Sequence, residues 1–244
     1  MKRIIYNDNL YPTIFKEHLL LKIANSSYKD NIFIEDVKNL TISSNLIMLN
    51  TYTINRFFKE LLKNDNDDIN FKVNKINMIY HTKTIQKYKV ELLININNTN
   101  WFMNVFIESF INLTGQNELI HLPKLKKRLP FKCLTNEEKL AKMFYQIINE
   151  TYETFEIFYD FYSLYYSKIE EESFLIALEK IYTYTNEKIK IKTQQEKVDS
   201  LRNNKFLYSR WNRLKQKRTD IKINLVDIQY CLNDVLTKLK ERVI

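Results

Sequence analysis

Apolar residues recur at helical spacing in two segments of the first third of the chain. Residues 12–25, PTIFKEHLLLKIAN, predict an amphipathic helix with Pro12 near its first turn. Residues 53–63, TINRFFKELLK, show the same spacing, and Thr53 is the candidate N-cap of that helix. Between these segments, residues 30–37 are rich in β-branched and aromatic residues, which predicts a short strand.

The pattern then changes from helical spacing to alternation. Residues 64–68, NDNDD, form a polar cluster typical of a turn. Residues 69–80 and 87–97 alternate apolar and polar positions, and residues 101–113 follow as a third candidate strand. These segments predict a sheet built on a hairpin or meander, with one face buried.

A basic tract separates this part of the chain from a helical part. Residues 121–132, HLPKLKKRLPFK, contain two prolines and five cations, and we interpret them as a linker. From Thr135 onward the spacing is helical, and Thr135 with Glu138 matches a capping box. The expected helices cover residues 135–149, 153–167, 171–187, about 195–216 and 221–241, with Asp220 or Thr219 as the cap of the last one.

The pattern therefore predicts an α+β protein with two domains. An α/β domain would occupy residues 1–122, and a helical bundle would occupy residues 131–244. The chain has one glycine, Gly115, so it contains no glycine-rich phosphate loop, and phosphate contacts must come from side chains or helix N-termini. The formal net charge of +9 favours polyanions such as RNA or DNA, and acidic protein partners.

Cysteine and histidine usage argues against a metal centre or a disulfide framework. Cys133 and Cys231 are far apart in the sequence, and His18, His81 and His121 lack partners at metal-ligand spacing. This usage fits a reducing cytoplasm. The first residues contain no apolar run typical of a signal peptide, and no stretch of about twenty apolar residues predicts a membrane span.

Several stretches, taken in order, resemble one protein family. They are NSSYKDNIFIED (25–36), the alternating segments of residues 67–97, FKCLTNEEKLAKMF (131–144), FEIFYDFYSLYY (155–166), and LYSRWNRL (207–214) with the helical segment that follows it. Together they resemble the AbiEii/AbiGii toxin nucleotidyltransferases over nearly the whole chain. The resemblance implies a nucleotidyltransferase-like mixed sheet with helices, followed by a C-terminal α-helical bundle. It also implies nucleotide transfer from an NTP to tRNA or a protein, in a phage-defence or toxin–antitoxin setting.

The chain departs from this family where the metal chemistry is expected. In the family, an Asp-x-Asp pair and a third carboxylate on the next strand hold Mg²⁺ against the triphosphate. Here the family's Gly-Gly turn is replaced by Ile34-Glu35-Asp36, and residues 37–55 contain no carboxylate. Asn104 stands where the third aspartate is expected. The sequence therefore predicts a catalytically degenerate member, with Mg²⁺ and NTP as cofactors only if activity is retained.

Three carboxylates and two family positions remain as candidate site residues. Asp30, Glu35 and Asp36 are the acidic candidates, although the neighbours Glu35 and Asp36 would point to opposite faces of a regular strand. Lys139 matches the lysine of the family's Glu-Lys-Leu motif, and Asp160 matches the second aspartate of its Asp-Tyr-Tyr-Asp motif, which implies nucleotide binding. The alternative is that Lys139 and Asp160 form a structural ion pair between helices.

Cations next to aromatic residues suggest a nucleic-acid or partner surface. The candidates are Lys126, Lys127 and Arg128 in the linker, and Arg210, Arg213, Lys217 and Arg218 near the C-terminus. Phe206, Tyr208 and Trp211 are interleaved with the second group, and arginine with aromatic rings suits base stacking and phosphate contact. In the alternative interpretation, Phe206 and Trp211 pack inside the bundle while the cations face water.

Three functions follow from these observations. The first is a degenerate nucleotidyltransferase-like protein that binds tRNA or another RNA, a nucleotide, or a protein partner such as an antitoxin. The second is an active transferase with a divergent site that uses Asp30, Glu35 or Asp36 together with Lys139. The third is a non-enzymatic subunit of a larger nucleoprotein assembly. None of the three involves a membrane.

Overall fold

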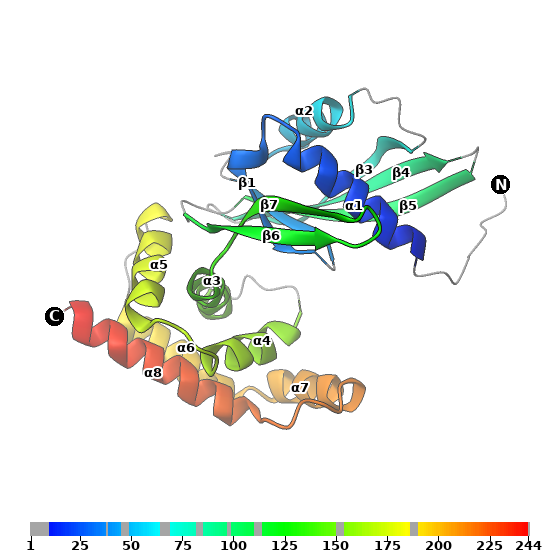
Figure 1. Cartoon of the computed structure of the whole chain (residues 1–244). Helices are drawn as coiled ribbons and strands as arrows, with labels where there is room; N and C mark the ends of the chain where they lie inside the picture. Colours follow the sequence, from blue (N-terminus) through cyan, green and yellow to red (C-terminus); the bar gives the residue numbers. More distant parts are fainter. Residues whose placement is uncertain are drawn as a thin grey trace. The chain divides into compact units, whose positions relative to one another are not determined.

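The computed structural model divides into two compact units, Met1–Leu134 and Thr135–Ile244. It describes residues 10–37, 39–44, 49–63, 69–81, 85–96, 99–109, 114–149, 154–185 and 190–243. The predicted turn at residues 64–68 lies outside these ranges. A mixed sheet with helices is followed by a helical unit, which confirms the α+β class (Figure 1).

The first unit is built on a seven-stranded sheet in the order β3-β4-β5-β2-β1-β7-β6. Its elements are α1 (Leu10–Ala24), a 3-10 turn (Lys29–Asn31), β1 (Ile32–Asp36), β2 (Thr41–Ser44), α2 (Thr51–Leu61), β3 (Asn70–His81), β4 (Gln86–Ile96), β5 (Thr99–Ser109), β6 (Gln116–Leu122) and β7 (Lys127–Cys133). The β2–β5 and β1–β7 pairs are parallel, and the others are antiparallel.

One face of this sheet, called the inner face here, carries the core. Alternate residues of β4 and β5, such as Val90, Leu92 and Val105, are fully buried there. Buried side chains of both α1 and α2, such as Leu19 and Phe58, belong to the same core cluster. Among the described residues of this unit, both α-helices therefore pack on the inner face, and the strand alternation places a different set of side chains on the opposite, outer face.

The predicted helix at residues 53–63 is α2, and its cap lies three residues earlier than expected. The side chain of Asn50 accepts a hydrogen bond from the Thr53 backbone N–H at 2.8 Å, and the Asn50 backbone N–H donates to Thr53 Oγ1 at 3.0 Å. Thr53 is thus the third residue of a capping box and not the N-cap itself.

The prediction of a linker at residues 121–132 is wrong, because this tract forms the turn and second strand of a β-hairpin. β6 and β7 pair antiparallel from Gln116↔Cys133 to Leu122↔Lys127 around a four-residue turn. The buried carboxylate of Glu17 on α1 accepts a hydrogen bond from the Leu125 backbone N–H in that turn at 2.9 Å. The basic tract therefore belongs to the sheet, and the first unit ends at Leu134 in the sequence.

Two features of the sheet lie outside the predicted pattern. The four-residue strand β2 was not predicted, yet it joins β1 to β5. In the edge strand β3, the pairing with β4 shifts register between Val73 and Lys75 and again between Met78 and Tyr80. Such irregularities interrupt the ladder and bend the strand.

The second unit contains six helices among its described residues. They are α3 (Asn136–Ile148), α4 (Glu156–Tyr165), α5 (Glu171–Tyr184), α6 (Ile191–Asn203), α7 (Lys205–Lys217) and α8 (Leu225–Val243). α3 packs against α4 and α5, and α8 packs against α4 and α6. Within the described part of the chain, no helix combines the length and apolar character that crossing a membrane requires.

The helix ends agree with the sequence in one place and differ in two. The predicted capping box of Thr135 and Glu138 is confirmed at the start of α3. The single helix expected at about 195–216 is two helices, because Asn204 ends α6 and caps α7. Asp220 does not cap α8, because that helix begins five residues later, at Leu225; its carboxylate binds Arg218 at 2.5 Å.

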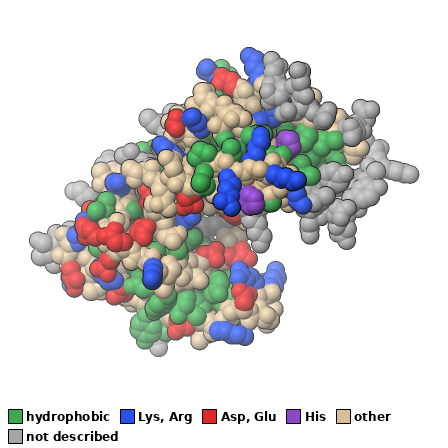
Figure 2. All heavy atoms as spheres, viewed as in Figure 1, with side chains coloured by type: hydrophobic (Ala, Val, Ile, Leu, Met, Phe, Trp, Pro, Cys, Tyr) green, Lys and Arg blue, Asp and Glu red, His purple; other side chains and the backbone are tan. Residues whose placement is uncertain are grey.

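Ion pairs join α5 to α8 on the outside of the second unit. Lys238 Nζ lies 2.7 Å from Glu171 and 2.9 Å from Asp234, and the Tyr165 hydroxyl of α4 donates to Asp234. One turn further along α8, Arg242 contacts Glu172 and Glu179 at 2.6 and 2.7 Å. Figure 2 shows acidic side chains gathered over α5.

Gly115 is required where it stands by space and by backbone conformation. Its φ is +60°, and an added Cβ would lie 2.6 Å from the Phe33 ring and 2.8 Å from the Cys133 carbonyl oxygen. Gly115→Ala should therefore lower the free energy of unfolding by about 2 kcal/mol or more, because the left-handed conformation alone costs 1–2 kcal/mol for other residues. Urea unfolding followed by circular dichroism measures this loss. The control Ser27→Ala, at an exposed position, should change it by less than about 0.5 kcal/mol; equal stabilities for the two variants would contradict the assignment.

The cluster around Asp234 should make stability depend on pH. Burial raises the pKa of Asp234, but hydrogen bonds from Tyr165 and Lys238 outweigh it and hold that pKa below its ordinary value of 3.8. A lowered carboxyl pKa stabilises the fold above the ordinary value, and the stabilisation disappears as the pH falls through the lowered one. Asp234→Asn should thus lower the melting temperature at pH 7, and the gap to the wild type should close in strong acid. Asp199→Asn, at an exposed aspartate of α6, is the control; a gap that does not change with pH would refute the cluster's role.

Candidate functional site

Three polar side chains of neighbouring strands meet on the outer face of the sheet. In the parallel β2–β5 ladder, Ser43 lies directly beside Glu108. In the β1–β2 pair, the Ser43 hydroxyl donates a hydrogen bond to the carboxylate of Glu35. Ser43 of the central strand is therefore flanked by one carboxylate on each side.

Ser43 and Glu108 are enclosed, whereas Glu35 is half-buried. Glu108 is 2% exposed and Ser43 is 1% exposed. Glutamate is almost never fully buried unless its charge is compensated, so a buried glutamate at a sheet centre marks a position with a specific role. The register of β5 places Glu108 on the outer face, because Val105 and Ile107 point to the core.

Lysines lie on both sides of this group. Lys87 of β4 is opposite Glu108 in the β4–β5 ladder, and its ammonium lies 5.5 Å from the centre of the Phe106 ring. Lys132 of β7 is beside Phe33 of β1; its Nζ lies 5.8 Å from the Phe33 ring and donates to the Asp30 carbonyl oxygen at 3.0 Å. Lys87 and Lys132 therefore lie on either side of Ser43 and its two carboxylates, as an anionic ligand on this face would require.

The side chains present do not fit the magnesium site that the family resemblance implies. Mg²⁺ prefers near-octahedral oxygen ligands at about 2.1 Å, supplied here by two carboxylates at most. Because neighbouring strands are about 4.8 Å apart, the backbones of Glu35 and Glu108 are separated by on the order of 10 Å, with the neutral Ser43 between them. Among the described residues, no group of three His, Cys, Asp or Glu side chains is placed to hold a metal.

The three acidic candidates from the sequence differ in their positions and contacts. Asp30 is exposed in the 3-10 turn, where its backbone carbonyl and not its carboxylate meets Lys132. Asp36 accepts a hydrogen bond from the Asn39 side chain at 2.7 Å. The expected strict alternation of Glu35 and Asp36 is wrong, because the register shifts between Ile34 and Asp36. Of the three candidates, Glu35 contacts the constellation, through the hydroxyl of Ser43.

Glu108 is the residue that the sequence reading missed. The position expected to carry the third carboxylate was Asn104, which is exposed and lies opposite Glu91 of β4, beyond the end of the β2–β5 ladder. Glu108 is on the same face four residues later, so the alternation of WFMNVFIES contains the signal. Without β2 in the prediction, there was no reason to prefer position 108.

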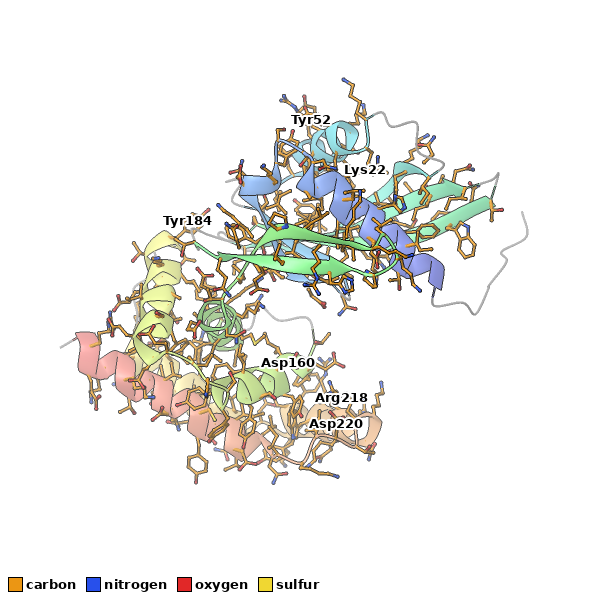
Figure 3. The ribbon with its side chains drawn as sticks, in the orientation of Figure 1. Lys22, Tyr52, Asp160, Tyr184, Arg218 and Asp220 are labelled. Carbon is orange, nitrogen blue, oxygen red and sulfur yellow. The ribbon has the colours of Figure 1, made fainter. Side chains whose placement is uncertain are left out.

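Lys139 and Asp160 both lie in the second unit. Lys139 is half-buried on α3, and Asp160 is exposed on α4. The Arg218 guanidinium lies 5.2 Å from the Tyr159 ring centre; its hydrogen bond to Asp220 raises its pKa, and Asp160 adds to this shift (Figure 3). These contacts give Arg218 a role in joining the end of α7 to α4. An ion pair between Lys139 and Asp160 stays a prediction.

The basic residues proposed to bind a partner form two groups. Lys126, Lys127 and Arg128 are exposed at the turn of the β6–β7 hairpin, over which Figure 2 shows cationic side chains gathered. Arg210, Arg213 and Lys217 are exposed on α7. α7 carries five cations in thirteen residues and no acidic residue.

The aromatic residues of α7 divide between core and surface. Trp211 is 1% exposed, so its predicted packing inside the bundle is confirmed. Phe206 is 59% exposed, so the same prediction for Phe206 is wrong. The Arg210 guanidinium lies 4.2 Å from the Phe206 ring centre and 5.3 Å from that of Phe155. An exposed aromatic ring in contact with an arginine thus lies on the most basic helix of the unit.

Comparison with known proteins gives structural similarity alone. No protein-family model matches the sequence, and no curated protein matches it. The crystal structure of JHP933 from Helicobacter pylori is similar at 12% identity, over 95% of this chain and 94% of that one, with a TM-score of 0.44. MenT4, a nucleotidyltransferase toxin from Mycobacterium tuberculosis H37Rv, is similar at 13% identity, over 94% of this chain and 92% of that one, with a TM-score of 0.49. At such identities and TM-scores, these likenesses carry no information about individual residues of this chain.

Proposed function

We propose that this chain is a nucleotidyltransferase-like protein, similar to the AbiEii/AbiGii toxins, that has lost the carboxylate set for metal-dependent transfer and acts by binding RNA. The proposal rests on one observation: the residue between the carboxylates of Glu35 and Glu108 is Ser43, which is neutral. The biological setting proposed with it is phage defence or a toxin–antitoxin pair.

The loss of transfer follows from electrostatics. Transfer of a nucleotidyl group requires positive charge on the phosphate oxygens in the transition state, which the family's Mg²⁺ supplies. Ser43 brings a neutral hydroxyl, and not a third carboxylate, to the position between Glu35 and Glu108. The residues that remain on this face can still contact an anion through Lys87 and Lys132, which supports binding without chemistry.

RNA as the bound partner is supported by the second unit. Four of the five cations of α7 are exposed, and no acidic residue of that helix neutralises them. Phosphate contact by such cations gives affinity for a polyanion without sequence preference. The proposed binding surface comprises Arg210, Arg213 and Lys217, whereas Arg218 is held by Asp220.

A second candidate is a transferase that works with two carboxylates, and burial of Glu108 is the observation that favours it. A buried carboxylate beside a serine hydroxyl is costly to maintain and is found where function requires it. This candidate predicts that labelled nucleotide from an α-labelled NTP is incorporated into RNA in the presence of Mg²⁺ or Mn²⁺, and that Glu108→Gln abolishes incorporation.

Placing a carboxylate at position 43 should create a cation site. Ser43→Asp adds a third acidic group between Glu35 and Glu108, so the variant should be less stable than the wild type without metal, because like charges repel in a buried site. Mn²⁺ should then raise its melting temperature by several degrees, since ligand that binds the folded state stabilises it. The wild type should show no such shift, alone or with NTP.

Thr41→Asp is the matched control for this experiment. Thr41 is on the same strand and the same face as Ser43, but its neighbour in β5 is Phe106 in place of Glu108. A carboxylate there should gain no Mn²⁺ stabilisation. Metal-dependent stabilisation of the wild type by NTP, or incorporation of labelled nucleotide by the wild type, would overturn the proposed loss of transfer.

A further inference from the structure

A small pocket lies at the start of α7, apart from the constellation on the sheet. Its volume is about 190 Å³, and it is lined by the end of α3, by α6 and by the first turns of α7. Ile148, Val198 and Leu207 are buried and form part of its apolar wall. Pockets for whole drug-sized ligands are usually larger than about 300 Å³, so this pocket suits a single ring system and not a nucleoside triphosphate.

Aromatic rings and an arginine form the mouth of the pocket. Phe155 stacks on the fully buried Phe158, with ring centres 5.8 Å apart and planes inclined by 20°, so this wall is fixed by the core. The Arg210 guanidinium lies over both Phe155 and the exposed Phe206. A flat ring entering here would meet aromatic and guanidinium surfaces, which stack on nucleobases of any identity.

The charge around the pocket favours a ligand that carries phosphate groups. Lys197 and Arg210 line it, and none of the described residues that line it is acidic. A second hollow on α7, of about 580 Å³, is lined by Lys205 and Arg213 and likewise has no acidic residue among its described lining. Arg210 and Arg213 are about 5 Å apart along the helix, within one turn.

We infer that this pocket receives one unpaired base of a single-stranded nucleic acid, while Lys205 and Arg213 contact the neighbouring phosphates. The inference rests on the RNA binding proposed above and makes it specific. A base inside a duplex is paired and stacked between its neighbours, so it cannot enter a side-chain pocket without being extruded, whereas an unpaired base can. The pocket should therefore favour single-stranded over double-stranded nucleic acid, because only an unpaired base is accessible to it, and it should do so regardless of sequence.

The test compares a fluorescein-labelled 12-nucleotide single-stranded RNA with the corresponding 12-base-pair duplex by fluorescence anisotropy on the full chain. The single strand should bind at least tenfold more tightly than the duplex. Phe206→Ala should weaken single-strand binding about tenfold, the loss expected when one stacked base loses its aromatic partner, and should leave duplex binding unchanged. Because Phe206 is 59% exposed, the variant should fold like the wild type.

Two further variants separate stacking from charge and from general surface effects. Arg213→Gln should remove one phosphate contact, so it should weaken binding and also lower the slope of log affinity against log salt by about one, whereas Phe206→Ala should leave that slope unchanged. Tyr230→Ala, at an aromatic residue 69% exposed on α8, is the matched control and should bind like the wild type.

The outcomes distinguish the pocket from the broader function. Equal binding of single strand and duplex, with no effect of Phe206→Ala, would overturn the pocket while RNA binding itself stands. Equal losses in Phe206→Ala and Tyr230→Ala would also overturn it. Failure of both RNAs to bind at low salt would reject the proposed RNA binding and the pocket with it.

Discussion

The parallel ladder between β2 and β5 is the contact on which the first unit depends. It joins the β3-β4-β5 meander to the β2-β1-β7-β6 half of the sheet, and it spans only the four residues from Thr41 to Ser44. Parallel neighbours need a long connection, and here α2, β3 and β4 lie between the two strands in the chain. The same ladder sets Ser43 against Glu108, so one short tertiary pairing determines both the sheet and the arrangement of its polar centre.

That dependence explains what the sequence could and could not predict. The long alternating segments that became β3, β4 and β5, and the helical spacing of α1 and α2, carry their signal locally and were identified. Thr41–Ser44 is too short and too small in its side chains to show a strand pattern, because its pairing is decided by distant residues. Glu108 gains its significance only from that pairing, so its place beside Ser43 could not be predicted from the sequence.

In the second unit, the clearest sequence signals mark the ends of helices. The reciprocal hydrogen bonds of Thr135 and Glu138 follow from residue type and spacing alone. Asn204 was overlooked because cations and aromatic residues continue on both sides of it. Because the helix breaks at Asn204, the apolar positions of α7 do not continue the periodicity of α6. The exposure of Phe206 could therefore not be extrapolated from the residues of α6. The lining of the pocket beside it combines three helices and is visible only in the fold.

The irregular edge strand β3 has a consequence for how this protein behaves among copies of itself. A long edge strand presents unpaired backbone groups that can recruit a strand from a neighbouring molecule. In β3, the two interruptions at Asn74 and Ile79 break the periodic array of donors and acceptors that such recruitment needs, and the exposed Lys72 and Lys75 add like-charge repulsion between two β3 edges. Geometry and charge thus both act against amyloid-like pairing of this twelve-residue edge, which exposes Met78.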